Sequence, residues 1–307
     1  MKKSCSINNK VLKRLKNEGK CISFDDDSKI VFISDVHRGD GGYADSLRLN
    51  NNIYKAALNY YYDNDFTLIE LGDGDELWKN KDCLDIAYFY KDIFEILKKF
   101  NDENRLHLVY GNHDIIKSND NFITKQKKVC ENICEGFGDK MIRLYESTKF
   151  YEGVVLNYKP LNKEIYAFHG HQADFINCNL WRVSRFLVRY IWRFLEGVGG
   201  FKAPTSPAKN YDKGDKIDKI LNQYAMKEKK MIICGHTHND RMPKPGQGLY
   251  FNDGCCVFPS EVTSIEINEG KIELVKWKID VNEESHLYIN RSLIAGPEKI
   301  SDYLEEV

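Results

Sequence analysis

The chain has 307 residues, of which 45 are Lys or Arg and 46 are Asp or Glu, giving a formal net charge of −1. A hydrophobic fraction of 42% and a charged fraction of 30% are typical of a globular protein and exclude an intrinsically disordered chain. The near-neutral balance disfavours a protein whose main role is to bind the nucleic-acid backbone, because such proteins carry a strong basic excess. No specific nucleic-acid partner is therefore expected.

The first half of the chain alternates predicted helices and strands. Three short apolar runs, each followed by a polar loop, are expected to be buried strands over residues 30–34, 66–71 and 106–110. Apolar residues recur at helical spacing and predict helices over residues 8–18, 45–62, 84–100 and 126–134. The β-α-β-α-β order indicates a mixed α/β fold in which helices cover the faces of a sheet.

In the second half of the chain, predicted strands follow one another more directly, which favours antiparallel pairing. Strands are expected over residues 150–158, 164–168, 231–234, 249–252, 261–268 and 271–280. Residues 174–228 are mostly helical in pattern. The whole chain is expected to divide into an N-terminal helical extension, a core in two pieces, a helical insertion and a C-terminal extension. These expected parts cover residues 1–29, 30–173 with 229–282, 174–228 and 283–307.

The nine cysteines are irregularly spaced and include no Cys-x-x-Cys pair. This pattern indicates free thiols in a reducing compartment rather than a disulfide framework or a zinc knuckle. The basic N-terminus lacks the continuous apolar core of a signal peptide, and no stretch reaches the roughly 18 apolar residues of a membrane span. A cytoplasmic location is therefore expected.

Five predicted strands end in residues that can bind a metal ion. The motifs are Asp35-Val36-His37, Gly72-Asp73, Gly111-Asn112-His113-Asp114, His169-Gly170-His171 and Gly235-His236-Thr237-His238. Ligand sites in open α/β sheets lie beyond the carboxyl ends of the strands, so we expect these side chains to gather at one sheet edge. Mixed imidazole and carboxylate ligands suit Mn, Fe, Zn or Co better than Ca or Mg. One such motif alone would carry little weight, whereas five in order predict a metal site.

These motifs, together with Glu76 after Asp73, resemble the signature of calcineurin-like metallophosphoesterases over about residues 30–254. The resemblance implies an α/β fold of the four-layer α/β/β/α sandwich type with a dinuclear centre at the sheet edge. Two divalent metal ions are the implied cofactors, with Mn favoured and Fe, Zn or Co as alternatives. The implied metal ligands are Asp35, His37 and His238 for the first ion, Asn112, His169 and His236 for the second, and Asp73 as the bridge.

The resemblance also implies catalytic roles for His113 and Glu76. His113 would donate a proton to the leaving oxygen or stabilise the phosphoryl charge, and Glu76 would orient it. Two metal ions can lower the pKa of a bridging water, which then becomes hydroxide, and can hold the phosphoryl oxygens during an in-line displacement. The expected reaction is hydrolysis of a phosphoester or diphosphate without a covalent protein nucleophile.

Several polar residues near the motifs have two interpretations. Arg38 could neutralise a substrate phosphate or be a solvated surface charge, and the sequence favours neither. His171 and Asp174 could orient ligands or contact substrate, or could simply cap the following helix. The two histidines His107 and His286 lie outside the motifs and are expected to be structural.

About 60 residues separate the last two histidine motifs, far more than a strand connection needs. One interpretation is a core helix with solvated arginines. The other is a lid over the metal site that binds a substrate with phosphate and apolar parts, or that touches a membrane surface through residues 181–201. The insertion carries arginines spaced three and four residues apart, which would form a basic stripe on a helix. The proposed substrate contacts in this stripe are Arg182, Arg185 and Arg189.

The place of this insertion resembles the helical cap of the UDP-2,3-diacylglucosamine diphosphatase branch, whose substrate is a nucleotide-linked lipid. That branch usually has Arg at the position of His113 and Asp at the position of His171. A broader nucleotide-linked or amphiphilic phosphoester or diphosphate is therefore expected, with peripheral contact at the inner face of the membrane as part of the lid hypothesis.

Two alternatives remain open. His113 and Glu76 allow a protein serine/threonine phosphatase. Such enzymes usually have Arg two residues after the acidic partner, whereas Leu77 and Trp78 follow Glu76 here. A catalytically inactive binding module is the other alternative, which the complete ligand set disfavours.

Overall fold

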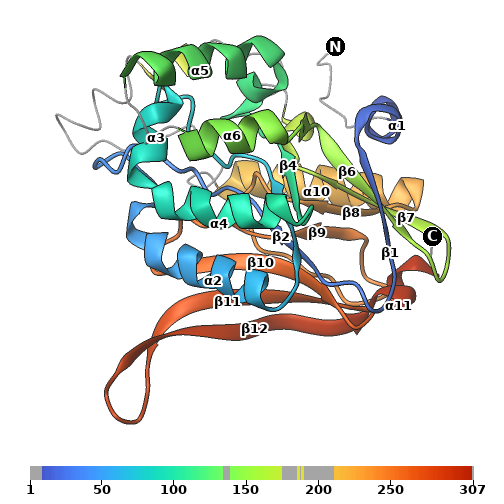
Figure 1. Cartoon of the computed structure of the whole chain (residues 1–307). Helices are drawn as coiled ribbons and strands as arrows, with labels where there is room; N and C mark the ends of the chain where they lie inside the picture. The colour runs from blue at the N-terminus through green and yellow to red at the C-terminus, as the bar shows by residue number, and fades with distance from the viewer. Residues whose placement is uncertain (1–8, 134–138, 175–184, 187, 190–210, 306–307) are drawn as a thin grey trace.

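The computed structural model describes residues 9–133, 139–174, 185–186, 188–189 and 211–305. This part of the chain is a mixed α/β fold with two β-sheets and eight α-helices (Figure 1). The metal-binding motifs of the sequence lie in the loops that leave these sheets.

The larger sheet has seven strands in the order β12-β11-β10-β2-β3-β4-β5. Its parallel half consists of β2 (Ile30–Ile33), β3 (Thr67–Leu71), β4 (Leu106–Val109) and β5 (Phe150–Tyr151). Its antiparallel half consists of β10 (Glu261–Asn268), β11 (Lys271–Val281) and β12 (Leu287–Lys299). All four residues of β2 are buried. A strand covered on both faces is expected to be a continuous apolar run, as this one is.

Helices cover one face of this sheet. They are α2 (Asn51–Asp63), α3 (Cys83–Phe89), α4 (Lys91–Asp102), α5 (Asp120–Ile133) and α6 (Asp139–Ser147). Val31 and Ile33 of β2 join Tyr54 of α2 and Phe94 of α4 in one hydrophobic cluster. Alternate residues of a strand point to opposite faces, so Phe32 packs on the other side of the sheet, in a second cluster.

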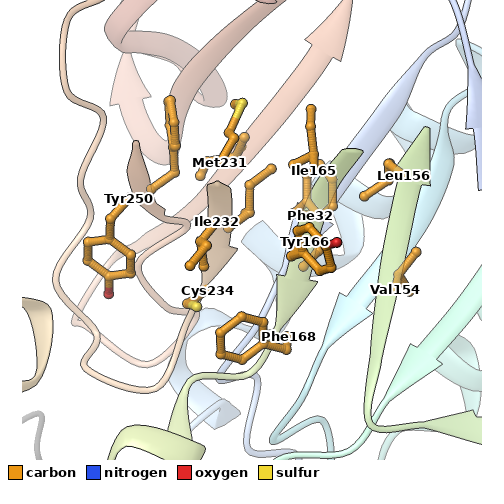
Figure 2. Packing of buried hydrophobic residues seen from close by; sticks show 14 of the residues in the cluster. Phe32, Val154, Leu156, Ile165, Tyr166, Phe168, Met231, Ile232, Cys234 and Tyr250 are labelled. Carbon is orange, nitrogen blue, oxygen red and sulfur yellow. The ribbon is translucent and has the colours of Figure 1, made fainter. Parts of the chain in front are cut away.

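The smaller sheet has the order β1-β6-β7-β8-β9. Its strands are β1 (Lys20–Phe24), β6 (Gly153–Tyr158), β7 (Lys163–Phe168), β8 (Met231–Cys234) and β9 (Tyr250–Asn252). Figure 2 shows Phe32 of the larger sheet beside Ile165 and Ile232 of the smaller one, within the second cluster. That cluster also includes side chains of the remaining helices, α1 (Asn9–Glu18), α10 (Tyr211–Glu228) and α11 (Ile300–Leu304).

Two predicted helices differ from the observed ones. The helix expected over 45–62 begins later, at α2, after a short 3-10 turn at Arg48–Asn50, because the Asp45 carboxylate accepts the Gly41 and Leu47 N–H groups in a loop. The helix expected over 84–100 is broken into α3 and α4 at Tyr90. The phenol of Tyr90 donates a hydrogen bond to Asp45 at 2.8 Å, which ties this break to the same loop.

The strand expected over 150–158 is two strands. The chain leaves the larger sheet after β5 and enters the smaller one at β6, so one apolar run serves both sheets. Two strands were not predicted at all. The first, β1, pairs in parallel with β6, and the second, β12, pairs with β11 along most of its length. Both segments of the chain that were expected to be terminal extensions thus contribute a strand to a sheet.

Most of the insertion predicted over 174–228 lies outside the described residues, although α10 covers its C-terminal part. No described helix is both long and apolar enough to cross a membrane.

Candidate metal centre

The five predicted motifs lie at the carboxyl ends of β2, β3, β4, β7 and β8 and are hydrogen-bonded to one another. The backbone N–H of His37 donates to the Asp73 carbonyl at 2.9 Å, which joins the first loop to the second. The backbone N–H of His113 donates to the Asp73 carboxylate at 2.7 Å. The N–H of His236 donates to the Asp35 carboxylate at 2.7 Å, so the last motif closes on the first. The sheet edges thus bring together residues from distant parts of the chain.

Most of the ligand-bearing loops have an unfavourable backbone conformation. Five of the seven predicted ligands have positive φ angles, namely Asp35 at 50°, His37 at 51°, Asp73 at 53°, His236 at 71° and His238 at 59°. Residues other than Gly rarely adopt this region, and such strain concentrates at functional sites, where the surrounding structure holds it. A side chain at Gly235 would collide with Ser34 and Asp35, so this position also requires the residue found there.

Asp35, His37 and His238 form the first group of buried ligand atoms, all within 4.8 Å of one another. The Nε2 atom of His238 lies 3.0 Å from Asp35 Oδ1, and that of His37 lies 3.6 Å from the same oxygen. Asp35 Oδ2 accepts hydrogen bonds, whereas Oδ1 is buried and makes no hydrogen bond within the described residues. An oxygen left in this state among imidazoles is suited to bind a cation.

Asp73, His169 and His236 form the second group, also within 4.8 Å. The Nε2 atom of His169 lies 3.2 Å from Asp73 Oδ2 and 3.3 Å from the side-chain oxygen of Asn112. The same Asp73 oxygen is 3.8 Å from His37 Nε2 and so faces both groups. His169 Nδ1 is 3.0 Å from the carbonyl of Leu71, which fixes the ring with Nε2 toward the group.

The electrostatics of the two groups also fit bound cations. Burial alone would raise the pKa values of Asp35 and Asp73, but neighbouring imidazoles, His238 for the first and His169 for both, hold them below the usual range. Conversely, burial would lower the pKa values of His169 and His238, but the carboxylates raise both to about 9. The carboxylates therefore attract positive charge into the site, and a divalent ion would provide it while the imidazoles bind in their neutral form.

His236 already has the form that a metal ligand needs. Burial is the main cause that lowers its pKa and keeps the ring neutral. Its Nε2 atom is buried without a hydrogen bond in the described part of the chain, and the nearest carboxylate, that of Asp174, is 3.6 Å away. The seven residues predicted as ligands are thus all found at this site.

His113 lies beside the two groups with its Nδ1 atom 2.9 and 3.0 Å from the two carboxylate oxygens of Glu76. The imidazole stacks on the indole of Trp78, with ring centroids 4.1 Å apart and planes at 16°. Burial would raise the pKa of Glu76, but His113 and His37 hold it well below the usual range, so Glu76 is a carboxylate. The pair predicted from the sequence is therefore in direct contact.

The position of Arg38 agrees with neither of the two interpretations that the sequence allows. Its side chain is only 1% exposed, so it is not a solvated surface charge. Its guanidinium donates to Glu70 at 2.6 and 2.7 Å and to Asp75 at 2.7 Å, and these carboxylates take up its donors. Lys117 lies 2.8 Å from Asp75 on the other side. The structure thus places Arg38 in a buried ion-pair network beneath the ligand loops.

The remaining predicted substrate contacts have different positions. His171 is buried, with its ring centroid 5.5 Å from that of His169. The guanidinium of Arg189 donates to backbone carbonyls of the loop after Glu76. Arg185 is half-buried, and Arg182 lies outside the described residues. A substrate role for these four residues stays a prediction.

Sequence reasoning did not identify two polar residues that support the ligands. Ser34 Oγ lies 2.8 Å from Asp35 Oδ2 and 2.6 Å from the Asp253 carboxylate. Burial raises the pKa of Asp253 well above its usual value, which favours the protonated acid. The available signal was position alone, because Ser34 directly precedes the first ligand and Asp253 follows β9.

The sequence model described as calcineurin-like phosphoesterase matches residues 28–240, which include all seven predicted ligands. No curated protein matches the chain. The family and the two groups of ligand atoms together fit a dinuclear site for divalent metal ions.

Proposed function

Since the chain belongs to the calcineurin-like phosphoesterase family and is a metal-dependent phosphoester hydrolase, we propose that it acts on a nucleotide-linked or amphiphilic phosphodiester or diphosphate. The observation that carries the hydrolase assignment is the pair of neighbouring ligand groups, with Asp73 in the second group and facing His37 of the first. The proposed metal is Mn²⁺, which suits mixed imidazole and carboxylate ligands.

The protein residues divide into two binding sets. Asp35, His37 and His238 would hold one ion, and the second would lie among Asn112, His169 and His236, with Asp73 between the two. When bound, the two ions supply an activated water and neutralise charge on the phosphoryl oxygens.

His113 is the proposed proton donor. Because Glu76 accepts a hydrogen bond from Nδ1, a ring that carries hydrogens on both nitrogens has Nε2 left to donate its proton to a leaving oxygen. The side chain of His113 is 20% exposed, whereas Glu76 is buried, so the imidazole is the partner that a substrate can reach. Glu76 orients the imidazole through both of its carboxylate oxygens.

The proposed substrate class depends on residues 174–228. We propose that they form a lid on a four-layer sandwich, in the layout of the UDP-2,3-diacylglucosamine diphosphatase branch. In support, Arg189 reaches the loop next to the proposed proton donor, and Phe186 exposes 58% of its surface nearby in the chain. A basic stripe with apolar neighbours would suit a substrate that combines phosphate and lipid, and could touch a membrane surface through residues 181–201.

The contact between His113 and Glu76 also supports a second candidate, a protein serine/threonine phosphatase. Trp78 disfavours this candidate, because it stands two residues after Glu76, where such enzymes usually have Arg, and its indole stacks on the His113 ring.

A substrate panel in Mn²⁺ would test the proposal. We expect turnover of nucleotide-sugar and lipid-linked diphosphates to exceed that of phosphomonoesters and phosphoproteins. Faster turnover of a phosphoprotein would reverse the assignment. Deleting residues 181–207 should reduce the preference for lipid-linked substrates, and an unchanged preference would contradict the lid.

Single substitutions would test the metal centre on an aryl phosphodiester. We expect Asp73→Ala and His236→Ala each to lower kcat/KM by at least about 1,000-fold, because outer-sphere partners alone typically contribute 10- to 100-fold. The matched control is His286→Ala, which changes an exposed histidine remote in sequence from every motif. Normal turnover in either ligand variant would contradict the proposed site.

A further inference from the structure

Trp78 is fixed in place on the loop that follows Asp73. Its side chain is buried, and its indole N–H donates to the carbonyl of Asn112 at 2.7 Å. His113 directly follows Asn112, and the indole of Trp78 lies flat on its ring. Trp78 thus holds the backbone and the side chain of the third motif at the same time.

The contacts around His113 leave one orientation for its ring. The carboxylate of Glu76 fixes Nδ1, but a single hydrogen bond lets a ring tilt about that bond. The indole plane, at 16° to the imidazole, restricts this tilt. On another side, the ring of His37 meets it edge-on, with centroids 4.6 Å apart at 89°. Glu76 therefore holds Nδ1, and Trp78 sets the plane in which Nε2 points.

Arg189 connects this loop to the insertion. Its Nε donates to the carbonyl of Trp78 at 3.1 Å, and its Nη2 donates to the carbonyls of Leu77 and Asn80 at 2.6 and 2.9 Å. A planar guanidinium can hold several acceptors in a fixed geometry, which an ammonium group cannot do. The backbone of Trp78 is thereby tied to a side chain from residues 174–228.

We infer that Trp78 is a positioning residue for His113 and that Arg189 makes this positioning depend on the insertion. The inference rests on the proposed role of His113 as proton donor. Arg189, predicted from the sequence as a substrate contact, would then act on the reaction through Trp78.

The dependence on the leaving group distinguishes positioning from a general loss of structure. A proton donor matters most when the leaving oxygen is basic, so its loss slows a phenyl ester more than a para-nitrophenyl ester. We would measure kcat for methyl phenyl phosphate and methyl para-nitrophenyl phosphate with Mn²⁺, using the full chain. His113→Ala defines the effect of removing the donor. A loss of about 100-fold or more is expected for the phenyl ester, and of no more than about tenfold for the para-nitrophenyl ester.

The test variants are Trp78→Leu and Arg189→Ala. Trp78→Leu should lower kcat for the phenyl ester by about 10- to 100-fold, as displacement of a catalytic group by about 1 Å can do. Arg189→Ala should act in the same direction with a smaller loss. Trp78→Phe, which keeps a flat ring, should recover part of the rate.

Each test variant has a matched control far from His113. Trp277→Leu also removes a buried indole whose N–H is hydrogen-bonded, in this case to Tyr61. Arg105→Ala also removes a guanidinium that donates to backbone carbonyls, those of Tyr62 and Phe66. Neither control should change the ratio of the two rates, whatever it does to the amount of folded protein.

The outcomes separate this inference from the proposed function. If His113→Ala changes the ratio and Trp78→Leu lowers both rates equally, the positioning role is wrong and the proton donor stays. If His113→Ala itself leaves the ratio unchanged, the proposed role of His113 fails, and the inference fails with it. A shifted ratio in His113→Ala, Trp78→Leu and Arg189→Ala supports the inference.

Discussion

The metal centre and the ion-pair network beneath it are both buried and polar, yet they compensate burial in opposite ways. We define the network as Arg38, Glu70, Asp75, Asp114 and Lys117, and its charges pair with one another at 2.6 to 2.9 Å. In the metal centre, Asp35 Oδ1 and His236 Nε2 are buried without hydrogen bonds within the described residues. The same loops supply residues to the network and to the metal centre, since Arg38 follows His37 and Asp75 closely follows Asp73.

This contrast explains how the strained ligand loops keep their shape. A buried ion pair that loses one partner leaves an uncompensated charge, so the network resists rearrangement. The network joins the ends of β2, β3 and β4, because Arg38 binds Glu70 and Asp75, and Lys117 joins Asp75 to Asp114. In the network the protein supplies its own countercharges, whereas the described residues of the metal centre leave free the donor atoms that a metal ion needs.

Breaking the network should have the largest effect on stability. Lys117→Met would leave Asp75 and Asp114 with one fewer cation in a fully buried place, and we expect the free energy of unfolding to fall by about 3–5 kcal/mol. Urea unfolding measured in the absence of metal would give this difference.

The matched control is Lys127→Met. Its ammonium pairs with Glu146 at 2.8 Å, but both side chains are more than 40% exposed, and such a pair contributes about 1 kcal/mol at most. Adding Asp114→Asn to Lys117→Met should recover part of the lost stability, because one unpaired carboxylate is removed. Equal losses in Lys117→Met and Lys127→Met would contradict the distinction between the network and an ordinary surface pair.

Supplying the missing cation should have the next largest effect. After chelation, adding Mn²⁺ to about 100 times its Kd should raise the free energy of unfolding by about 2.7 kcal/mol for each site filled. Thermal unfolding across a Mn²⁺ titration would measure this gain, with metal content determined in parallel. Asp73→Asn should lose most of the gain, since Asp73 faces both ligand groups.

An exposed carboxylate provides the control for this titration. Asp63→Asn changes a residue at the end of α2 that is exposed to solvent, and its gain with Mn²⁺ should equal that of the unmodified chain. If Asp73→Asn gained as much as Asp63→Asn, the shared-ligand assignment would be wrong.

The two regions also differ in how far the sequence predicts them. Each ligand directly follows an apolar run, so the local pattern locates a strand end, and strand ends meet at a sheet edge. For this reason the sequence alone predicts Asp35, Asp73 and His236 as ligands. The contact between His113 and Glu76 was implied only by the family resemblance, because these residues come from different loops.

No comparable sequence pattern identifies the residues of the ion-pair network. Arg38 pairs with Glu70, 32 residues away, and Lys117 with Asp75, and no periodicity relates such positions. The two interpretations of Arg38, a substrate contact and a solvated charge, did not include a buried ion pair, because charged residues are rarely buried. Trp78 was missed for a similar reason, since an aromatic residue after a motif is most simply assigned to the core.

The secondary structure shows the same division. Buried strands such as β2 were predicted because both faces are apolar. The edge strands β1 and β12 were not, because many of their residues are exposed or half-buried and their sequences alternate weakly. Pairing with a neighbour, rather than the strand's own composition, determines such edges.

His107 gives a smaller test of the rule that buried polar groups here need a countercharge. It lies on β4, and burial lowers its pKa to about 4, with Lys20 as a second cause. The folded pKa is thus below the value of 6.5 for the unfolded chain, so protonation favours unfolding. Its contribution to stability is complete above about pH 6.5 and is lost as the pH falls toward 4.

His107→Leu should therefore make the protein less sensitive to acid in that window. A shift of this size corresponds to about 3 kcal/mol at most, and since the ring is partly exposed we expect a difference of about 1–2 kcal/mol between the chains at pH 4. Chemical unfolding at several pH values would measure it, with His286→Leu as the control on an exposed ring. The other titrating groups are the same in both chains, so they cancel in the comparison. Parallel stability curves for His107→Leu and the unmodified chain would mean that β4 tolerates a buried imidazolium without a countercharge, unlike the histidines of the metal centre, which face carboxylates.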